Sequence, residues 1–209
     1  MEKGKIARHG LEVLSVAAIG VIASKPWNSL WLGLPIASYL ALMFYEYKSY
    51  VTDRQSRVKE QLKLLMKLVS FDTASDVRCT YHVPCWGKQI RQVFDYIPSG
   101  GGGSRKFPQD KGIGGKAFSE KKWLVENFRD DEEYRLQMVT KYGYTSAELR
   151  KRRADRRSYF CYSLVDEKHE VLGLIYFDAS AVNTFTLDDT DSKMKMLIDG
   201  CDLIKSNLL

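Results

Sequence analysis

The residues best suited to chemistry in this sequence are cationic, and they are clustered. Six basic side chains fall within eight positions, with only Glu148 and Asp155 beside them: Arg150, Lys151, Arg152, Arg153, Arg156 and Arg157. A guanidinium group binds phosphate or carboxylate through two parallel hydrogen bonds, so this basic run could form an anion site. As a helix, it would place Arg150, Arg153 and Arg157 on one side. Two other interpretations stay open, namely solvated cations at a helix end and a basic patch against anionic lipids.

Other basic and aromatic side chains could complete such a site. The glycine-rich segment carries Arg105, Lys106, Lys111 and Lys116. Aromatic residues in the expected strands and beside them could stack a heterocycle, although this pattern is equally typical of an ordinary core: Tyr81, Phe94, Tyr96, Trp123, Tyr162 and Tyr176. The predicted ligand-binding residues are therefore Arg105, Lys106, Lys116, Trp123, Arg150, Arg153, Arg157, Tyr162 and Tyr176.

Patterns typical of catalysis or metal binding are weak. The four cysteines lack metal-ligand spacing, and the three histidines are scattered. The glycine run at 99–104 completes neither a Walker pattern nor GxGxxG, so we interpret it as a flexible linker, natural or engineered, rather than a phosphate cradle. We therefore expect no metal, no cofactor and no enzymatic activity. One alternative is a cysteine-based reductase for a small oxidised substrate, which would depend on Cys79 or Cys161.

The elements that must position these residues divide into an apolar and a charged part. The 209 residues carry a net charge of +6, yet residues 1–47 hold only 7 charged side chains and residues 48–209 hold 51. Two apolar runs, 11–24 and 29–45, are separated by a short turn. Their lengths approach the roughly 20 residues that a spanning helix needs, which predicts a transmembrane hairpin over 1–47.

The charges that flank this hairpin predict its orientation. Lys3, Lys5 and Arg8 precede it and Lys48, Arg54 and Arg57 follow it, whereas the turn offers only Lys25. The positive-inside rule then places both termini in the cytoplasm, at the inner membrane of a cell. A signal peptide and a buried or interfacial hairpin are the alternatives.

A connecting helix is expected over 48–70. Val51, Val58 and Leu65 recur every seven residues, and no proline or glycine lies between Tyr45 and Val69. Such a stripe fits a helix packed on its own domain, and it equally fits a dimerising helix that continues stiffly from the second membrane span.

The remainder, 71–209, predicts an α+β domain with an antiparallel sheet and flanking helices. Expected strands cover 77–83, 89–97, 123–128, 158–165 and 171–178, with the last two joined as a hairpin. Expected helices cover 111–118, 130–142, 145–157 and a stretch from Thr186 to the end. A pocket should then lie over one face of the sheet.

This part of the chain resembles the GAF family of small sensory domains. The likeness rests on Gly112-Ile-Gly-Gly115-Lys-Ala117, on Trp123-Leu-Val125, and on the hairpin 159–178 with Gly173 inside it and Asp178 closing it. The resemblance implies a GAF-like fold over roughly 52–209. The residue set of cyclic-nucleotide-binding members, a chromophore-attaching cysteine and the cysteine set of the methionine-sulfoxide reductase branch find no match, so the ligand stays open.

These features together predict a membrane-anchored sensor or effector. Its GAF-like domain would bind a small anionic ligand, such as a nucleotide, and signal through the connecting helix to the bilayer. The layout resembles membrane-disrupting effectors of bacterial antiviral signalling. The alternative is a membrane-tethered interaction scaffold that binds no small molecule. We also expect a homo-oligomer and, because a charge of +6 is modest, no nucleic-acid partner.

Overall fold

A computed structural model describes residues 30–69, 76–150, 155–188 and 190–208. The chain divides into two units, Met1–Arg54 and Gln55–Leu209. The long helix α2 (Leu30–Val69) begins in the first unit and ends in the second. It is continuous because its sequence offers no glycine or proline after Pro35.

The predicted transmembrane hairpin is not shown. Its first apolar run lies outside the described residues, and the second forms the beginning of α2. No helix in the described ranges combines the length and the apolar character needed to cross a bilayer.

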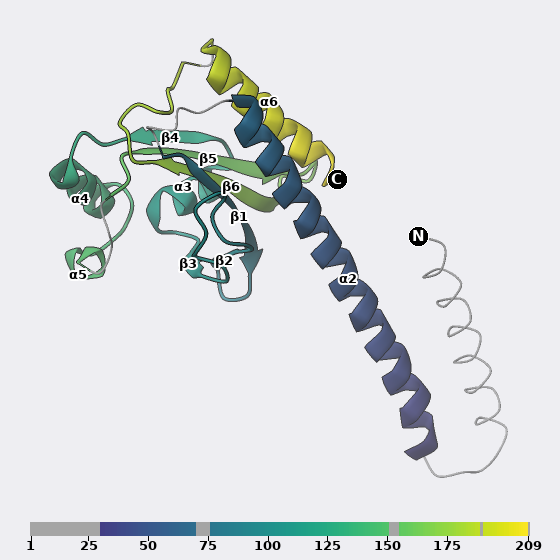
Figure 1. Cartoon of the computed structure of the whole chain (residues 1–209). Helices are drawn as coiled ribbons and strands as arrows, with labels where there is room; N and C mark the ends of the chain where they lie inside the picture. Colours follow the sequence, from purple (N-terminus) through teal and green to yellow (C-terminus); the bar gives the residue numbers. More distant parts are fainter. Residues whose placement is uncertain (1–29, 70–75, 151–154, 189, 209) are drawn as a thin grey trace. The chain divides into compact units, whose positions relative to one another are not determined.

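The second unit contains an antiparallel sheet of six strands in the order β3-β2-β1-β6-β5-β4. The strands are β1 (Arg78–Cys85), β2 (Gln89–Gln92), β3 (Lys106–Pro108), β4 (Leu124–Asn127), β5 (Ser158–Val165) and β6 (Val171–Ala179). The helices after α2 are α3 (Gly112–Glu120), α4 (Asp131–Thr140), α5 (Ser146–Leu149) and α6 (Ser192–Ser206). The predicted α+β class and antiparallel hairpin order are confirmed (Figure 1).

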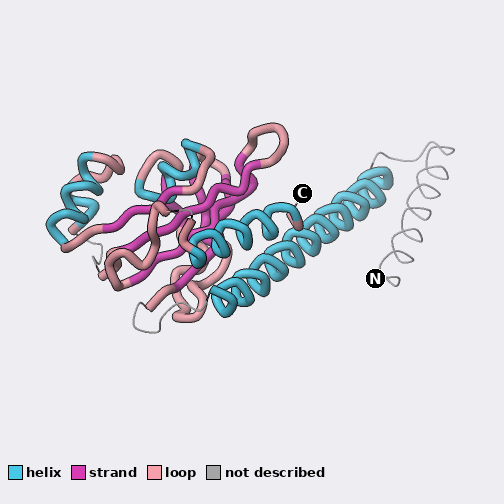
Figure 2. Tube along the Cα trace, turned by 90° about the horizontal axis from the view of Figure 1, so that it is seen from above, coloured by secondary structure: helices cyan, strands magenta, loops and turns pink. Residues whose placement is uncertain are grey.

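Two apolar clusters cover the two faces of this sheet. On one face, α6 lies beside the second half of α2, where Val58, Leu62 and Leu65 are buried (Figure 2). On the other face, α3 and α4 bury Ile113, Ala117, Tyr134 and Met138. Alternation along each strand sends neighbouring side chains to opposite clusters, as expected for a pleated sheet. We call these the α2/α6 face and the α3/α4 face.

Several predicted boundaries are wrong for local reasons. The helix expected over 145–157 ends at Leu149, and residues 155–157 are not helical, so Arg150 and Arg157 do not share one helical side. A capping box joins Thr145 and Glu148 at the start of α5, as the sequence predicts. The C-terminal helix begins at Ser192 rather than near Thr186, because Asp191 accepts hydrogen bonds from the backbone N–H groups of Lys193 and Met194.

The strand predicted over 89–97 ends at Gln92, so the irregular segment around the glycine run is longer than predicted. Residues 106–108 form β3, which pairs with β2 at the edge of the sheet. Gly100, Gly101 and Gly102 adopt positive φ angles between 76° and 92°, a region that glycine enters without strain. This turn returns the chain so that Arg105 and Phe107 reach the α3/α4 face.

Candidate functional site

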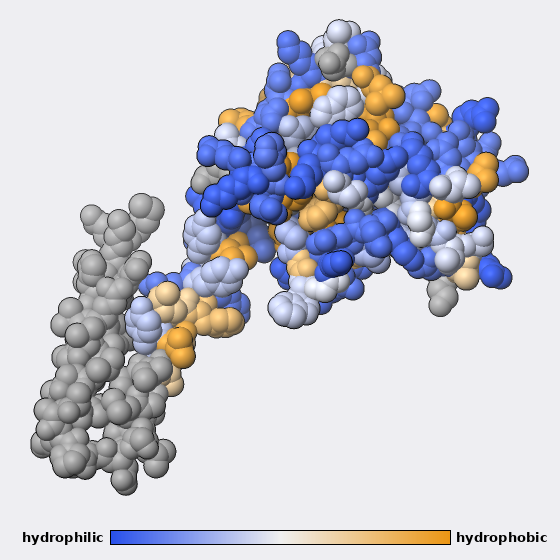
Figure 3. Space-filling model, turned by 180° about the vertical axis from the view of Figure 1, so that it is seen from behind, coloured by the Kyte–Doolittle hydropathy of each residue, from blue (hydrophilic) through white to orange (hydrophobic). Residues whose placement is uncertain are grey.

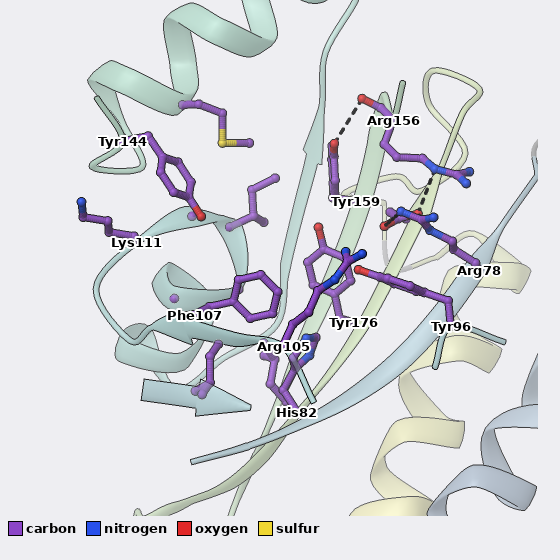
Figure 4. Close-up of a pocket in the computed structure, with 18 of the residues that line it drawn as sticks. Arg78, His82, Tyr96, Arg105, Phe107, Lys111, Tyr144, Arg156, Tyr159 and Tyr176 are labelled. Atoms are coloured by element: carbon purple, nitrogen blue, oxygen red, sulfur yellow. Dashed lines mark hydrogen bonds and ion pairs between the residues drawn. The ribbon is translucent and has the colours of Figure 1, made fainter. Parts of the chain in front are cut away.

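A cavity of about 670 Å³ opens on the α3/α4 face (Figure 4). Strands β1, β2, β3, β5 and β6 supply part of its lining, and the start of α3, helix α4 and neighbouring loops supply the rest. Gly112, Gly114 and Gly115 lie at its wall, and a Cβ on Gly115 would stand 2.9 Å from the Gln109 carbonyl oxygen. Because Gly115 has no side chain, the start of α3 can lie close to the Gln109 backbone beside the cavity. The volume suits a small metabolite.

Aromatic rings form one side of this cavity. His82 on β1 packs edge-on against Phe107 of β3 and Tyr176 of β6, with ring centroids 5.6 and 5.7 Å apart. Tyr176 in turn contacts Tyr159 of β5 at 6.1 Å, also edge-on. Such a wall offers π faces and edges to a planar ligand.

A buried ion-pair cluster occupies the end of the sheet where β1 begins and β6 ends. Arg78 donates to both carboxylate oxygens of Asp178, at 2.7 and 3.3 Å, and its guanidinium lies 4.0 Å from the Tyr96 ring centroid. Arg156 donates to the carbonyl and a side-chain oxygen of Asp76, both at 2.8 Å, and its Nε is 3.3 Å from Asp178. Burial raises the pKa of Asp178, while the two arginines oppose that shift.

The cavity carries an excess of positive charge. Arg78, Arg105, Lys111 and Arg156 line it, against Asp155 and Asp178. Lys111 is ion-paired with Glu148 at 2.8 Å, and this contact lowers the pKa of Glu148 to about 2. Arg105 is exposed, and no acidic side chain in the described part of the chain forms an ion pair with it. An incoming anion would therefore meet an uncommitted guanidinium at Arg105.

His82 adds a buried polar group to the same cavity. Only 4% of its surface is exposed, and burial lowers its pKa to about 4, partly offset by a hydrogen bond with the Leu174 backbone. The imidazole is therefore neutral at pH 7. Its Nδ1 atom is buried without a hydrogen-bond partner.

Of the eight predicted ligand-binding residues that the structure describes, two line this cavity, Arg105 and Tyr176. Lys106 is exposed on β3, and Lys116 lies over the Tyr142 ring at 5.6 Å. Trp123 and Tyr162 belong to the α2/α6 face, where the Tyr162 hydroxyl donates to Asp202 at 2.5 Å.

The described members of the basic run do not converge on the cavity as a unit. Arg150 is exposed just after α5, and Arg157 pairs with Asp131. Arg153 lies outside the described residues. Arg156, which we did not predict as a ligand-binding residue, is the described member of the run that lines the cavity.

Sequence reasoning also missed Arg78, His82 and Asp178. A signal was available, because β1 reads Arg-Cys-Thr-Tyr-His and so places polar residues at alternate positions of a buried strand. Asp178 gives a similar signal, because it is a charged residue near the end of the largely apolar strand β6. Strand pairing then sets Arg78 opposite Asp178 and His82 opposite Leu174.

The cysteines do not converge on the cavity. Cys79, Cys161 and Cys201 are buried, and Cys79 and Cys161 belong to clusters on opposite faces of the sheet. Burial raises the pKa of Cys79 to about 12 and that of Cys161 well above its usual value. Among the described residues, no group of three or more His, Cys, Asp or Glu side chains is placed to hold a metal ion.

This chain resembles solved structures in fold, but its sequence matches no family model and no curated protein. A GAF domain of a sensor histidine kinase from Bacillus halodurans is 17% identical, with a TM-score of 0.45, covering 75% of this chain and 94% of that one. The GAF region of a putative membrane protein from Geobacter sulfurreducens is 12% identical, with a TM-score of 0.47, covering 75% and 99%. These likenesses concern the fold alone.

Enzymes also occur among the similar structures, which corrects one prediction. The type II free methionine-R-sulfoxide reductase of Thermoplasma acidophilum is 11% identical, with a TM-score of 0.47, covering 74% of this chain and 94% of that one. The prediction that the chain has no enzymatic activity is therefore wrong as an inference from this fold, because the fold accommodates catalysis as well as sensing.

Proposed function

We propose that the second unit, Gln55–Leu209, is a sensory domain that binds a small anionic ligand with a planar ring, of the nucleotide kind, in the cavity on the α3/α4 face. The observation that carries this proposal is the pairing of an aromatic wall with an exposed guanidinium, that of Arg105, in one cavity of suitable volume. Aromatic edges and faces suit a base, and the guanidinium suits a phosphate.

The buried charges support the same proposal. Arg78, Arg156 and Asp178 are expensive to bury, and replacing such a cluster by apolar residues often costs nothing in stability. The α2/α6 face shows that this chain can close a sheet face with apolar side chains. Polar groups retained on the α3/α4 face are therefore better explained by recognition than by folding.

Thermal unfolding of the full chain with four mononucleotides, AMP, GMP, CMP and UMP, tests the proposal. A ligand at a hundredfold excess over its dissociation constant stabilises the folded state by about 2.7 kcal/mol. We expect a higher melting temperature with at least one nucleotide and a much smaller change with inorganic phosphate. Unchanged melting temperatures with all four nucleotides would favour the scaffold that binds no small molecule.

The variant Arg105→Gln tests whether the anionic group of the ligand binds at Arg105. We expect about tenfold weaker nucleotide binding, because a hydrogen bond to a charged group is lost. Two matched controls are Lys106→Gln on β3 and Arg150→Gln after α5, both exposed and outside the cavity lining. If Arg150→Gln weakens binding more than Arg105→Gln, the anion site lies at the basic run instead.

Membrane association and oligomerisation also stay proposals. Their support is a set of exposed apolar and aromatic side chains on the first half of α2, visible in Figure 3 beside the grey atoms: Tyr39, Leu40, Met43, Phe44, Tyr45, Tyr47 and Tyr50. Aromatic rings favour the interface of a bilayer. Flotation of the full chain with phosphatidylglycerol vesicles is expected, and recovery of all protein in the vesicle-free fraction would overturn membrane association. The role in antiviral defence stays a prediction, based on the expected arrangement of a membrane hairpin joined to a ligand-binding domain.

A further inference from the structure

We infer that the planar ring of the ligand donates an N–H hydrogen bond to Nδ1 of His82, with its anionic group at Arg105. This inference rests on the proposed function and adds to it the polarity and the orientation of the ligand. It concerns one of the two cavity-lining side chains, among the residues that the structure describes, whose buried polar atom has no hydrogen-bond partner. The other is Arg156, whose Nε already lies 3.3 Å from a carboxylate oxygen of Asp178.

The first step is the unsatisfied atom itself. A buried polar group without a partner costs about 1–3 kcal/mol, so folded proteins rarely retain one without a reason. His82 is 4% exposed and is held between Phe107 and Tyr176, so its ring cannot turn to solvent without losing both contacts. The buried Nδ1 is therefore fixed in place at the cavity (Figure 4).

The second step is the direction of the hydrogen bond. The Leu174 backbone, which His82 faces across the β1–β6 pairing, raises the pKa of the imidazole as a hydrogen-bond partner. Because Nδ1 has no partner, we assign this contact to Nε2. A neutral imidazole carries one donor and one acceptor nitrogen, and a nitrogen that donates to a backbone carbonyl leaves the other as the acceptor. Nδ1 therefore requires a donor, and a carboxylate or phosphate oxygen cannot supply one.

The third step separates the two ends of the ligand. Arg78 and Arg156 are already committed to Asp178 and Asp76, whereas Arg105 is exposed and forms no ion pair with a described acidic residue. The anion therefore belongs near Arg105 at the open side, and the donor-bearing ring belongs at the buried side beside His82. A base with an exocyclic amine or a ring N–H, joined to a phosphate, meets both requirements.

Two pairs of probes test this on the unmodified full chain. The first pair is AMP and purine riboside 5′-monophosphate, which lacks the 6-amino group. The second is UMP and 3-methyluridine 5′-monophosphate, which lacks the ring N–H. Within the pair that binds, we expect the donor-bearing member to bind about tenfold more tightly by isothermal titration calorimetry.

A variant assigns the effect to His82. His82→Phe keeps an aromatic ring against Phe107 and Tyr176 but removes the acceptor. It should bind both members of a pair with equal affinity. That affinity should match the one that the unmodified chain has for the member without an N–H donor. His82→Asn, which retains an acceptor, should restore part of the difference. The probe pairs on the unmodified chain remain decisive if a variant does not fold.

The outcomes are distinct. Equal affinity within each pair overturns the role of His82 while the proposed function stands, and a water molecule would then satisfy Nδ1. A difference within a pair that persists in His82→Phe also overturns it. Absence of binding by all four probes overturns the inference. The nucleotide proposal falls with it only if GMP and CMP also leave the melting temperature unchanged.

Discussion

The two faces of the sheet are built from the same strands but are closed in different ways. On the α2/α6 face, Phe160, Ile175 and Phe177 are fully buried against one another and against helices α2 and α6. On the α3/α4 face, the alternate positions of β5 and β6 carry Tyr159 and Tyr176, which border a cavity together with other polar side chains. The first face stabilises the fold, and the second retains costly polar groups that a stable fold does not require.

This comparison teaches where to look for function in a small α+β domain. A sheet alternates its side chains by geometry, so adjacent residues such as Tyr176 and Phe177 can serve separate purposes. Substitutions on the two faces should therefore separate stability from binding.

The largest effect is expected on the α2/α6 face. Phe177 is fully buried, with ring centroids 5.8 Å from Phe160 and 6.3 Å from Phe185. Phe177→Ala should lower the free energy of unfolding by about 4 kcal/mol, because it leaves a cavity in a packed core. Urea unfolding measures this. The neighbouring Tyr176→Ala should cost clearly less, since its ring already borders a cavity; equal losses would contradict the distinction between the faces.

An intermediate effect is expected from pH on the α3/α4 face. The unfolded chain binds a proton at His82 near pH 6.5, but the folded chain binds it only near pH 4. Between these values the unfolded state holds more protons, so stability falls as pH falls through this window, by about 3 kcal/mol in all. The comparison is between wild type and His82→Phe in urea unfolding at pH 7 and pH 4. The variant should lose about 3 kcal/mol less than wild type on acidification, and an equal loss would contradict the shift.

The smallest effect is expected at the ion-pair cluster. Arg78→Gln removes the two-point partner of Asp178, which is 2% exposed, but Arg156 remains 3.3 Å away. We expect a loss of about 2 kcal/mol, below the range for a fully isolated buried charge. Arg91→Gln on β2 is the matched control and should change stability by less than about 0.5 kcal/mol. A similar loss in both variants would contradict a specific role for the cluster.

Much of the fold could be predicted from the sequence because its signals are local. The hairpin of β5 and β6, the glycine-rich start of α3 and the Thr145–Glu148 capping box each depend on residues close together in the chain. The end of α5 and the start of α6 could not be placed, since residues 155–157 and the Thr186 region both continue helix patterns in the sequence but are not helical in the structure.

The site was decided by the tertiary structure. The sequence established that cations and aromatic rings are abundant, but the period of two in a strand does not say which face holds the ligand. Trp123 and Tyr162 were therefore predicted together with Tyr176, although they lie on the opposite face. Arg78 and Asp178 are 100 positions apart, and only the pairing of β1 with β6 makes them partners. Local patterns determine elements, whereas strand pairing and burial determine which polar groups meet, because both depend on contacts between distant parts of the chain.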